Sequence, residues 1–90
     1  MVVNLDDMST EPRDYFVWAQ YHGSNSRTIA AELFPTKPAR YVRVTRDLAN
    51  YASNKGTALA CRARGDIPAA QVYEGICERI YAKLPAYARW

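Results

Sequence analysis

The fold is decided by residues 38–84, which read PARYVRVTRDLANYASNKGTALACRARGDIPAAQVYEGICERIYAKL. After the central segment Arg64-Gly65-Asp66-Ile67-Pro68, apolar residues recur with the i, i+3, i+4 and i+7 spacing of a helix that buries one side. These residues are Tyr73, Ile76, Cys77, Ile80, Tyr81 and Leu84. The arm before the segment carries a similar stripe, formed by Tyr41, Val44, Leu48, Tyr51 or Ala52, and Leu59. Because two apolar stripes joined by a short loop pack antiparallel, the sequence predicts an all-α domain with a long helical hairpin, about 38–64 and 67–84.

The turn of this hairpin contains residues with recognisable roles. Gly65 suits the left-handed conformation that ends many helices, and Asp66 is a natural N-cap for the helix that follows. Within the first arm, Asn54-Lys55-Gly56 is the weakest point, because glycine costs about 1 kcal/mol relative to alanine inside a helix. We therefore expect a kink or break at Gly56.

One or two shorter helices are expected before the hairpin. Residues 1–9 lack periodicity, which predicts a flexible N-terminal arm. Ser9 or Thr10 can cap a first helix, which ends at Gly23 and contains an apolar run of Tyr15, Phe16, Val17, Trp18, Ala19 and Tyr21. The run is apolar on nearly all sides, so we expect it to be deeply packed or to offer a face to a partner.

A second short helix is expected over residues 27–34. Ser24 or Ser26 can cap it, and Pro35 ends it because proline disfavours a helical residue before it. The predicted organisation is thus an arm over 1–9, a single helical domain over 10–84 and a C-terminal aromatic tail over 85–90.

The net charge of +3 is unevenly distributed along the chain. Residues 1–36 carry a net charge of −3, residues 37–64 a net charge of +6, and residues 65–90 none. The arginines of the first hairpin arm are Arg40, Arg43, Arg46, Arg62 and Arg64. Such a basic surface suits nucleic acid or an acidic protein surface. The alternative is a helix face that simply contacts water.

The two cysteines, Cys61 and Cys77, are not expected to form a disulfide. With the turn centred near Gly65, the residue opposite Cys61 is about Ala70, and a disulfide needs Cα atoms within about 7 Å. Cys77 lies on the apolar stripe and reads as a reduced core thiol. The chain shows no signal peptide and no apolar run of the length that spans a bilayer, so it reads as cytoplasmic.

Nothing in the sequence favours an enzyme, a metal site or a cofactor. The lone His22 lies beside Gly23 at an expected helix end, where an exposed or capping role is the common one. Zinc-ligand spacing, a phosphate-binding glycine loop and a nucleophile elbow are all missing. Glu74 and Glu78 lie one turn apart on the solvent side, where ion pairs such as Glu74 with Arg79, or Glu78 with Lys83, explain them.

A DNA-binding interpretation has to be considered as well. Residues 26–34, a turn and residues 41–48 have the rhythm of a helix-turn-helix, which would place Lys37, Arg40 and Arg43 near phosphates or base edges. A structural or assembly protein is a further alternative.

The hairpin tip and the tail offer residues suited to contacts with a partner. Ile67 and Pro68 form an exposed Xaa-Pro bond that a prolyl isomerase could bind, although proline also commonly begins a helix. Tyr87, Arg89 and Trp90 are residue types of interface anchors, unless Trp90 folds back onto the domain.

Three segments resemble small accessory proteins of lambdoid enterobacterial phages. They are Asp14-Tyr-Phe-Val-Trp-Ala-Gln-Tyr-His-Gly, Arg62-Ala-Arg-Gly-Asp-Ile-Pro, and Ile76-Cys-Glu-Arg-Ile-Tyr with the end Leu-Pro-Ala-Tyr-Ala-Arg-Trp90. Of these proteins, the chain is most similar to the anti-RecBCD (Abc) family of Salmonella phages.

This resemblance implies a non-enzymatic phage protein that binds the host RecBCD helicase–nuclease, with RecC as the candidate subunit. Blocking or redirecting the nuclease would protect linear phage DNA and favour phage recombination. The resemblance also suggests a host peptidyl-prolyl isomerase as a partner, and Pro68 is the position expected to meet it. The residues expected to meet RecBCD or DNA come from the charge and aromatic pattern: Arg40, Arg43, Arg46, Arg62, Arg64, Tyr87, Arg89 and Trp90.

Overall fold

The computed structural model describes residues 11–90, which are all-α. Their four α-helices are α1 (Pro12–Ser24), α2 (Ser26–Leu33), α3 (Val42–Ala63) and α4 (Ile67–Lys83), with short 3-10 helices η2 (Pro38–Tyr41) and η3 (Ala86–Ala88). The predicted hairpin and two shorter N-terminal helices are therefore confirmed. The expected flexible arm over 1–9 lies outside the described residues. Helix α1 begins at Pro12 with Glu11 in the N-cap position, so the expected cap by Ser9 or Thr10 is wrong.

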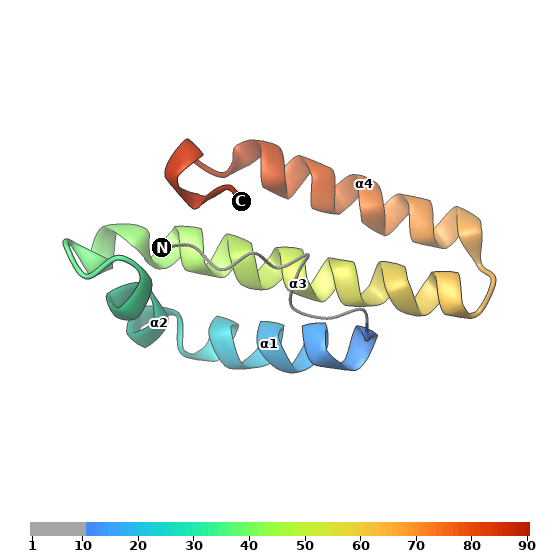
Figure 1. The fold of residues 1–90 in the computed structure, drawn as a ribbon, viewed down its shortest axis with the longest axis horizontal. Helices are drawn as coiled ribbons and strands as arrows, with labels where there is room; N and C mark the ends of the chain where they lie inside the picture. Colours follow the sequence, from blue (N-terminus) through green and yellow to red (C-terminus); the bar gives the residue numbers. More distant parts are fainter. Residues whose placement is uncertain (1–10) are drawn as a thin grey trace.

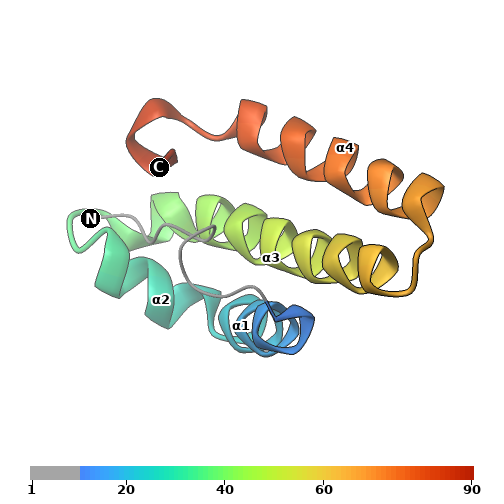
Figure 2. The ribbon, with the colours of Figure 1, turned by 45° about the vertical axis from the view of Figure 1, so that its right-hand side comes forward.

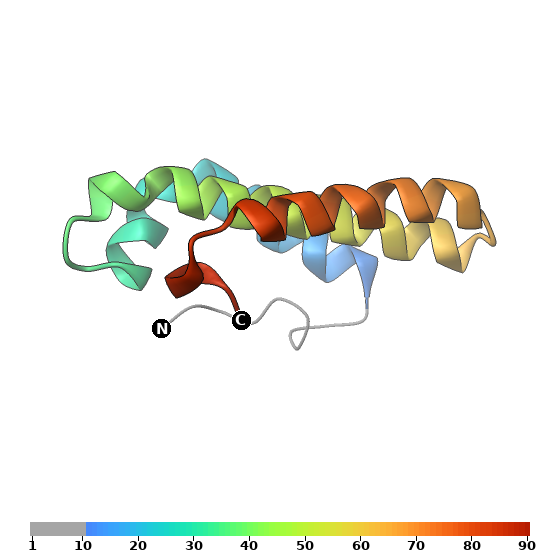
Figure 3. The same ribbon diagram turned by 90° about the horizontal axis from the view of Figure 1, so that it is seen from above.

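Helix α3 is the centre of the domain. Helix α1 packs along one side of it and α4 along the other, so the three long helices form a single layer (Figures 1 and 3). Helix α2 packs against the N-terminal part of α3 and against η2 (Figure 2). Since α3 has neighbours on two sides, its buried residues cannot lie on one narrow stripe: they are Thr45, Leu48, Ala49, Tyr51, Ala52, Gly56, Ala58 and Cys61.

The core forms where α1, α3 and the C-terminal end of the chain meet. Tyr15 and Trp18 enter it from α1, and Leu48 from α3. Leu84 and Ala88, which follow α4, are fully buried in the same cluster. The tail over 85–90 thus packs on the helical domain instead of extending from it.

Gly56 lies inside an unbroken helix, so the expected kink in the first hairpin arm is wrong. A Cβ at this position would lie 2.9 Å from Cε1 of Phe16 and 3.0 Å from the carbonyl oxygen of Pro12. Glycine is present because it lets α1 approach the backbone of α3 closely. Packing between the two helices offsets the low helix propensity that motivated the prediction.

The hairpin turn is as the sequence predicts. Gly65 has a φ of 80°, and its N–H donates to the Arg62 carbonyl while the Asp66 N–H donates to the Cys61 carbonyl. These two bonds define a Schellman motif, which satisfies carbonyl groups at the end of α3. The Asp66 carboxylate accepts a hydrogen bond from the Ala69 N–H at 3.3 Å and caps α4.

The boundary between the first two helices differs from the prediction. Gly23 does not end α1, which continues to Ser24. Asn25 ends it: its side-chain amide donates to the Tyr21 carbonyl at 2.9 Å, and α2 begins at the next residue. Neither Ser24 nor Ser26 acts as an N-cap, and Ser26 is itself buried. A polar side chain that forms a hydrogen bond with the preceding turn can end a helix, as glycine does.

Both cysteines are free, as predicted, and both are buried, which was predicted for Cys77 alone. The Cys77 thiol donates to the Tyr51 carbonyl, with 3.7 Å between sulfur and oxygen, across the α3–α4 interface. Free cysteines of this kind behave as small apolar residues in the core.

Candidate binding surfaces

Four exposed arginines surround one surface depression at the N-terminal end of α3. They are Arg27 of α2, Arg40 of η2, and Arg43 and Arg46 of α3, and we call them the arginine face. The depression has a volume of about 530 Å³, and Ala39 and Val42 complete its lining. Since residues three apart lie on the same side of a helix, the chain places the last three arginines in one row.

None of these four guanidinium groups forms an ion pair within the described part of the chain. Arg40 lies over the Tyr41 ring, with its guanidinium carbon 5.9 Å from the ring centroid. The sequence predicts Arg40, Arg43 and Arg46 as binding residues, and the structure brings them together. The prediction missed Arg27, because nothing in the local sequence shows that α2 lies beside the start of α3.

The other two arginines of the first arm lie at the opposite end of α3, beside the hairpin turn (Figure 1). Arg62 donates two hydrogen bonds to the Glu74 carboxylate at 2.6 and 2.7 Å. The Arg64 guanidinium donates to the Cys61 sulfur at 3.4 Å. The structure therefore separates Arg62 and Arg64 from the arginine face.

The pairing expected between Glu74 and Arg79 is wrong. A partner on the same helix competes with one across the hairpin, and Arg62 offers the bidentate geometry that carboxylates prefer. The hydrogen bond from Arg62 lowers the pKa of the Glu74 carboxyl, against a smaller opposing effect of burial, and raises that of Arg62.

Arg89 and Trp90 of the tail contact the helical domain itself. Arg89 donates to the Leu84 and Ala82 carbonyls at 3.0 and 2.9 Å, which caps the end of α4. Trp90 folds back, with its ring centroid 4.9 Å from those of Tyr51 and Tyr81. The second alternative from the sequence, a Trp90 packed on the domain, is thus the correct one.

Tyr87 is the exposed aromatic residue of the tail. It is 52% exposed, yet its ring lies 5.7 Å from that of Phe34 and 5.4 Å from that of Tyr41, centroid to centroid. These edge-on contacts attach the tail to η2 and to the end of α2. Tyr87 therefore lies near the arginine face.

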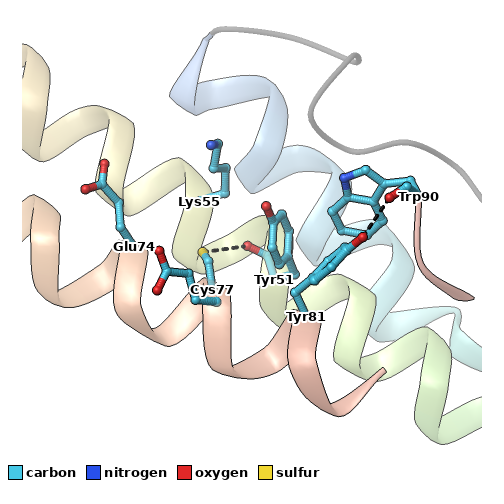
Figure 4. A pocket seen from close by; sticks show the side chains of 7 residues that line it. Tyr51, Lys55, Glu74, Cys77, Tyr81 and Trp90 are labelled. Carbon is cyan, nitrogen blue, oxygen red and sulfur yellow. Dashed lines mark hydrogen bonds between the residues drawn. The ribbon is translucent and has the colours of Figure 1, made fainter. Parts of the chain in front are cut away.

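A groove between α3 and α4 was not foreseen from the sequence (Figure 4). It has a volume of about 570 Å³ and is lined by Tyr51, Lys55, Glu74, Cys77, Glu78, Tyr81 and Trp90. The Tyr81 hydroxyl donates to the Trp90 carbonyl at 2.6 Å, which holds the terminal residue at the rim. Aromatic rings and charges of both signs line the groove, so its chemistry does not select one ligand class.

A second exposed surface runs along α1. Arg13, Val17 and Tyr21 follow one another at a spacing of four residues and border a depression of about 400 Å³; we call them the α1 strip. Val17 is 61% exposed and Tyr21 is 54% exposed, while Tyr15 and Trp18 of the same helix are buried. The aromatic helix thus packs on the core, as expected, and leaves Val17 and Tyr21 exposed.

His22 is neither fully exposed nor a helix cap, in contrast to the prediction. It is half-buried and stacks on Trp18, with 3.6 Å between ring centroids and an angle of 12° between ring planes. Its Nδ1 atom is buried without a hydrogen-bond partner among the described residues. Burial lowers the pKa of the His22 imidazole, and the nearby Glu32 carboxylate partly opposes this shift.

The hairpin tip exposes Ile67 and Pro68, as the sequence predicts. Of the five prolines of the chain, only Pro35 and Pro68 are exposed. The position of Pro68 in the first turn of α4 also fits its ordinary role in starting a helix.

Comparisons of the chain with protein families, with curated protein sequences and with solved structures found no match. Within residues 11–90, no three His, Cys, Asp or Glu side chains lie together as a metal site would require. Over the same residues, no helix has the length and apolar character needed to cross a membrane.

Proposed function

We propose that this chain is a non-enzymatic phage protein that acts by binding a larger host machine, the RecBCD helicase–nuclease. The proposal comes from the resemblance of its sequence to the anti-RecBCD family. Acting in the cytoplasm of the bacterial host, with RecC as the candidate contact, it would protect linear phage DNA and favour phage recombination.

The α1 strip is the observation that carries this proposal. Its exposed Val17 and Tyr21 are apolar residues on a helix that is already held to the core by Tyr15 and Trp18. Exposed aromatic and aliphatic residues on a rigid helix are typical anchors of protein–protein contacts. The tail is the weaker choice, because Trp90 and Arg89 already contact the domain.

Replacement of Val17 by Glu tests the α1 strip. A charge in the centre of an apolar contact should weaken binding to purified RecBCD at least about 10-fold. The matched control is Val72→Glu on α4, because Val72 is 60% exposed and Val17 61%. Binding can be measured by surface plasmon resonance with immobilised RecBCD. Equal affinities of the two variants would assign the contact to another surface, and no binding by the wild type would remove the proposal itself.

A host peptidyl-prolyl isomerase is the second proposed partner, with Ile67 and Pro68 as its contact. The tip is accessible, and an isomerase needs an exposed Xaa-Pro bond. Pro68→Ala should abolish co-purification with the isomerase, while Pro35→Ala, the other exposed proline, should leave it unchanged. Co-purification of the Pro68→Ala protein at the wild-type level would exclude this contact.

A helix-turn-helix-like DNA-binding regulator is the second candidate function. The favourable observation is that Arg40 and Arg43 are exposed at the start of α3, directly after α2 and its connection. Lys37, the third residue named for this role, is exposed in the connection itself with a φ of 65°. Selective binding of one duplex sequence over others would favour the regulator over the RecBCD modulator. Self-association without either partner would instead favour an assembly protein.

A further inference from the structure

We propose that the arginine face binds the phosphate backbone of duplex DNA without sequence preference. This inference deepens the proposed function, on which it rests for its biological setting: a protein bound to a DNA-processing machine would also contact the DNA that the machine holds. The chemistry can be tested on the isolated protein.

The first argument is the local excess of positive charge. Residues 27–46 contain five basic residues and one acidic residue. The four arginines of the face are exposed, and none is neutralised by an ion pair within residues 11–90. Four like charges around one depression repel one another, so an anionic ligand that bridges them is stabilised.

The second argument is the type of cation. All the charged residues that line the depression are arginines. The planar guanidinium group of arginine can donate two parallel hydrogen bonds to phosphate oxygens. A duplex carries one phosphate per strand for about every 3.4 Å along its axis, and residues three apart on an α-helix advance by about 4.5 Å. Several phosphates therefore lie within reach of arginines that belong to one short stretch of helix.

The third argument is what surrounds the arginines. Arg46 also lines a neighbouring depression between α1 and α3, of about 450 Å³, where Gln20, Asn50 and Ser53 supply uncharged polar groups. Side chains of these types commonly donate to phosphate oxygens. Ala39 and Val42 complete the lining of the depression between the arginines, and this lining includes no aromatic side chain. The exposed Tyr87 lies beside the depression, with its ring packed edge-on against Tyr41.

The arginine face fits duplex DNA better than single-stranded nucleic acid, because the aromatic rings beside it already contact one another. Single strands are held by stacking their bases on exposed aromatic rings. Tyr41, which lies under the Arg40 guanidinium, is half-buried and stacks on Phe34 with 4.6 Å between centroids, and the exposed Tyr87 ring meets both of these rings edge-on. Three different elements supply the arginines, which suits contacts along a backbone better than the reading of one base pair.

The test is fluorescence anisotropy of the purified full chain with a labelled 20-base-pair duplex of random sequence. About four phosphate contacts give a slope of roughly −3.6 for log K against log salt concentration, so affinity should fall about 10²-fold between about 50 and about 200 mM salt. The double variant Arg43→Ala/Arg46→Ala should reduce this slope by about 2 and weaken binding about 10-fold or more at low salt.

The matched control is Arg79→Ala/Lys83→Ala, which removes the same charge from two exposed positions of α4. It should change the affinity less than about 3-fold, and circular dichroism should show both variants folded. Equal losses in the two double variants would overturn the inference, because net charge alone would then explain binding. So would tighter binding of a single strand, strong preference for one duplex sequence, or displacement of DNA by polyglutamate at equal charge concentration.

The two proposals can fail separately. If the duplex is not bound while RecBCD is, the arginine face is not a DNA site and the proposed function stands. If the duplex is bound through this face and RecBCD is not, the inference stands and the proposed host partner is wrong.

Discussion

At the scale of single residues, the half-buried His22 couples folding to pH near neutrality. Its lowered pKa means that the folded protein favours the neutral imidazole, so the unfolded chain binds more protons below the ordinary pKa of 6.5. As far as His22 is concerned, the free energy of unfolding therefore has its full value above pH 6.5. It decreases as the pH falls from 6.5 toward the folded-state pKa of His22. Glu74, whose pKa is also lowered, acts in a separate window below its ordinary value of 4.5.

We therefore predict that the free energy of unfolding decreases between pH 7 and pH 5 because of His22. His22 is the only histidine of the chain, so its ring resonances in an NMR titration give the folded-state pKa directly, and we expect a value below 6.5. In His22→Gln the decrease in this range should be reduced, as measured by urea unfolding at several pH values. A titration midpoint above 6.5 would show that burial does not control this ring.

At the scale of elements, the close contact between α1 and α3 depends on Gly56. A methyl group there would meet the Phe16 ring and the Pro12 carbonyl oxygen, both at 2.9–3.0 Å, and the backbone of α1 cannot easily move away. Gly75 on α4 is a matched case, because a methyl group there would meet only the Arg79 guanidinium at 3.8 Å. The two glycines have the same helix propensity and different surroundings.

Gly56→Ala should destabilise the domain by about 1–2 kcal/mol, because overpacking outweighs the gain in helix propensity. Gly75→Ala should stabilise it by about 0.5–1 kcal/mol, since only the propensity changes. Chemical denaturation followed by circular dichroism measures both. If Gly56→Ala is also stabilising, α1 does not approach α3 as closely as described.

At the scale of the whole molecule, the two candidate binding surfaces lie on different elements. The α1 strip lies along α1, while the arginine face lies where α2, η2 and α3 meet (Figure 2). Each can therefore be altered without disturbing the other. A small domain buries a limited core, and here residues after α4 add to it: Leu84 and Ala88 belong to the core, and Trp90 packs against it.

Much of this architecture could be predicted from residue spacing alone. The hairpin, its Gly65–Asp66 turn and the buried Cys77 depend on periodicity and on helix caps, which act within a few residues of the chain. The row Arg40, Arg43 and Arg46 is likewise a matter of helical repeat. The predicted end of α1 is wrong, because both Gly23 and Asn25 are residues that can end a helix and local rules do not choose between them.

What the sequence by itself determined is therefore the set of helices and the turn that joins the two longest ones. Only the tertiary structure decided which distant residues become neighbours: Arg27 with Arg43, Arg62 with Glu74, and Trp90 with Tyr51. The physical reason is that caps and periodicity are set by bonds within one helix, while these pairs depend on which sides of separate helices pack together. Gly56 shows the same division, because its helix propensity is a local property and its value to the fold comes from α1.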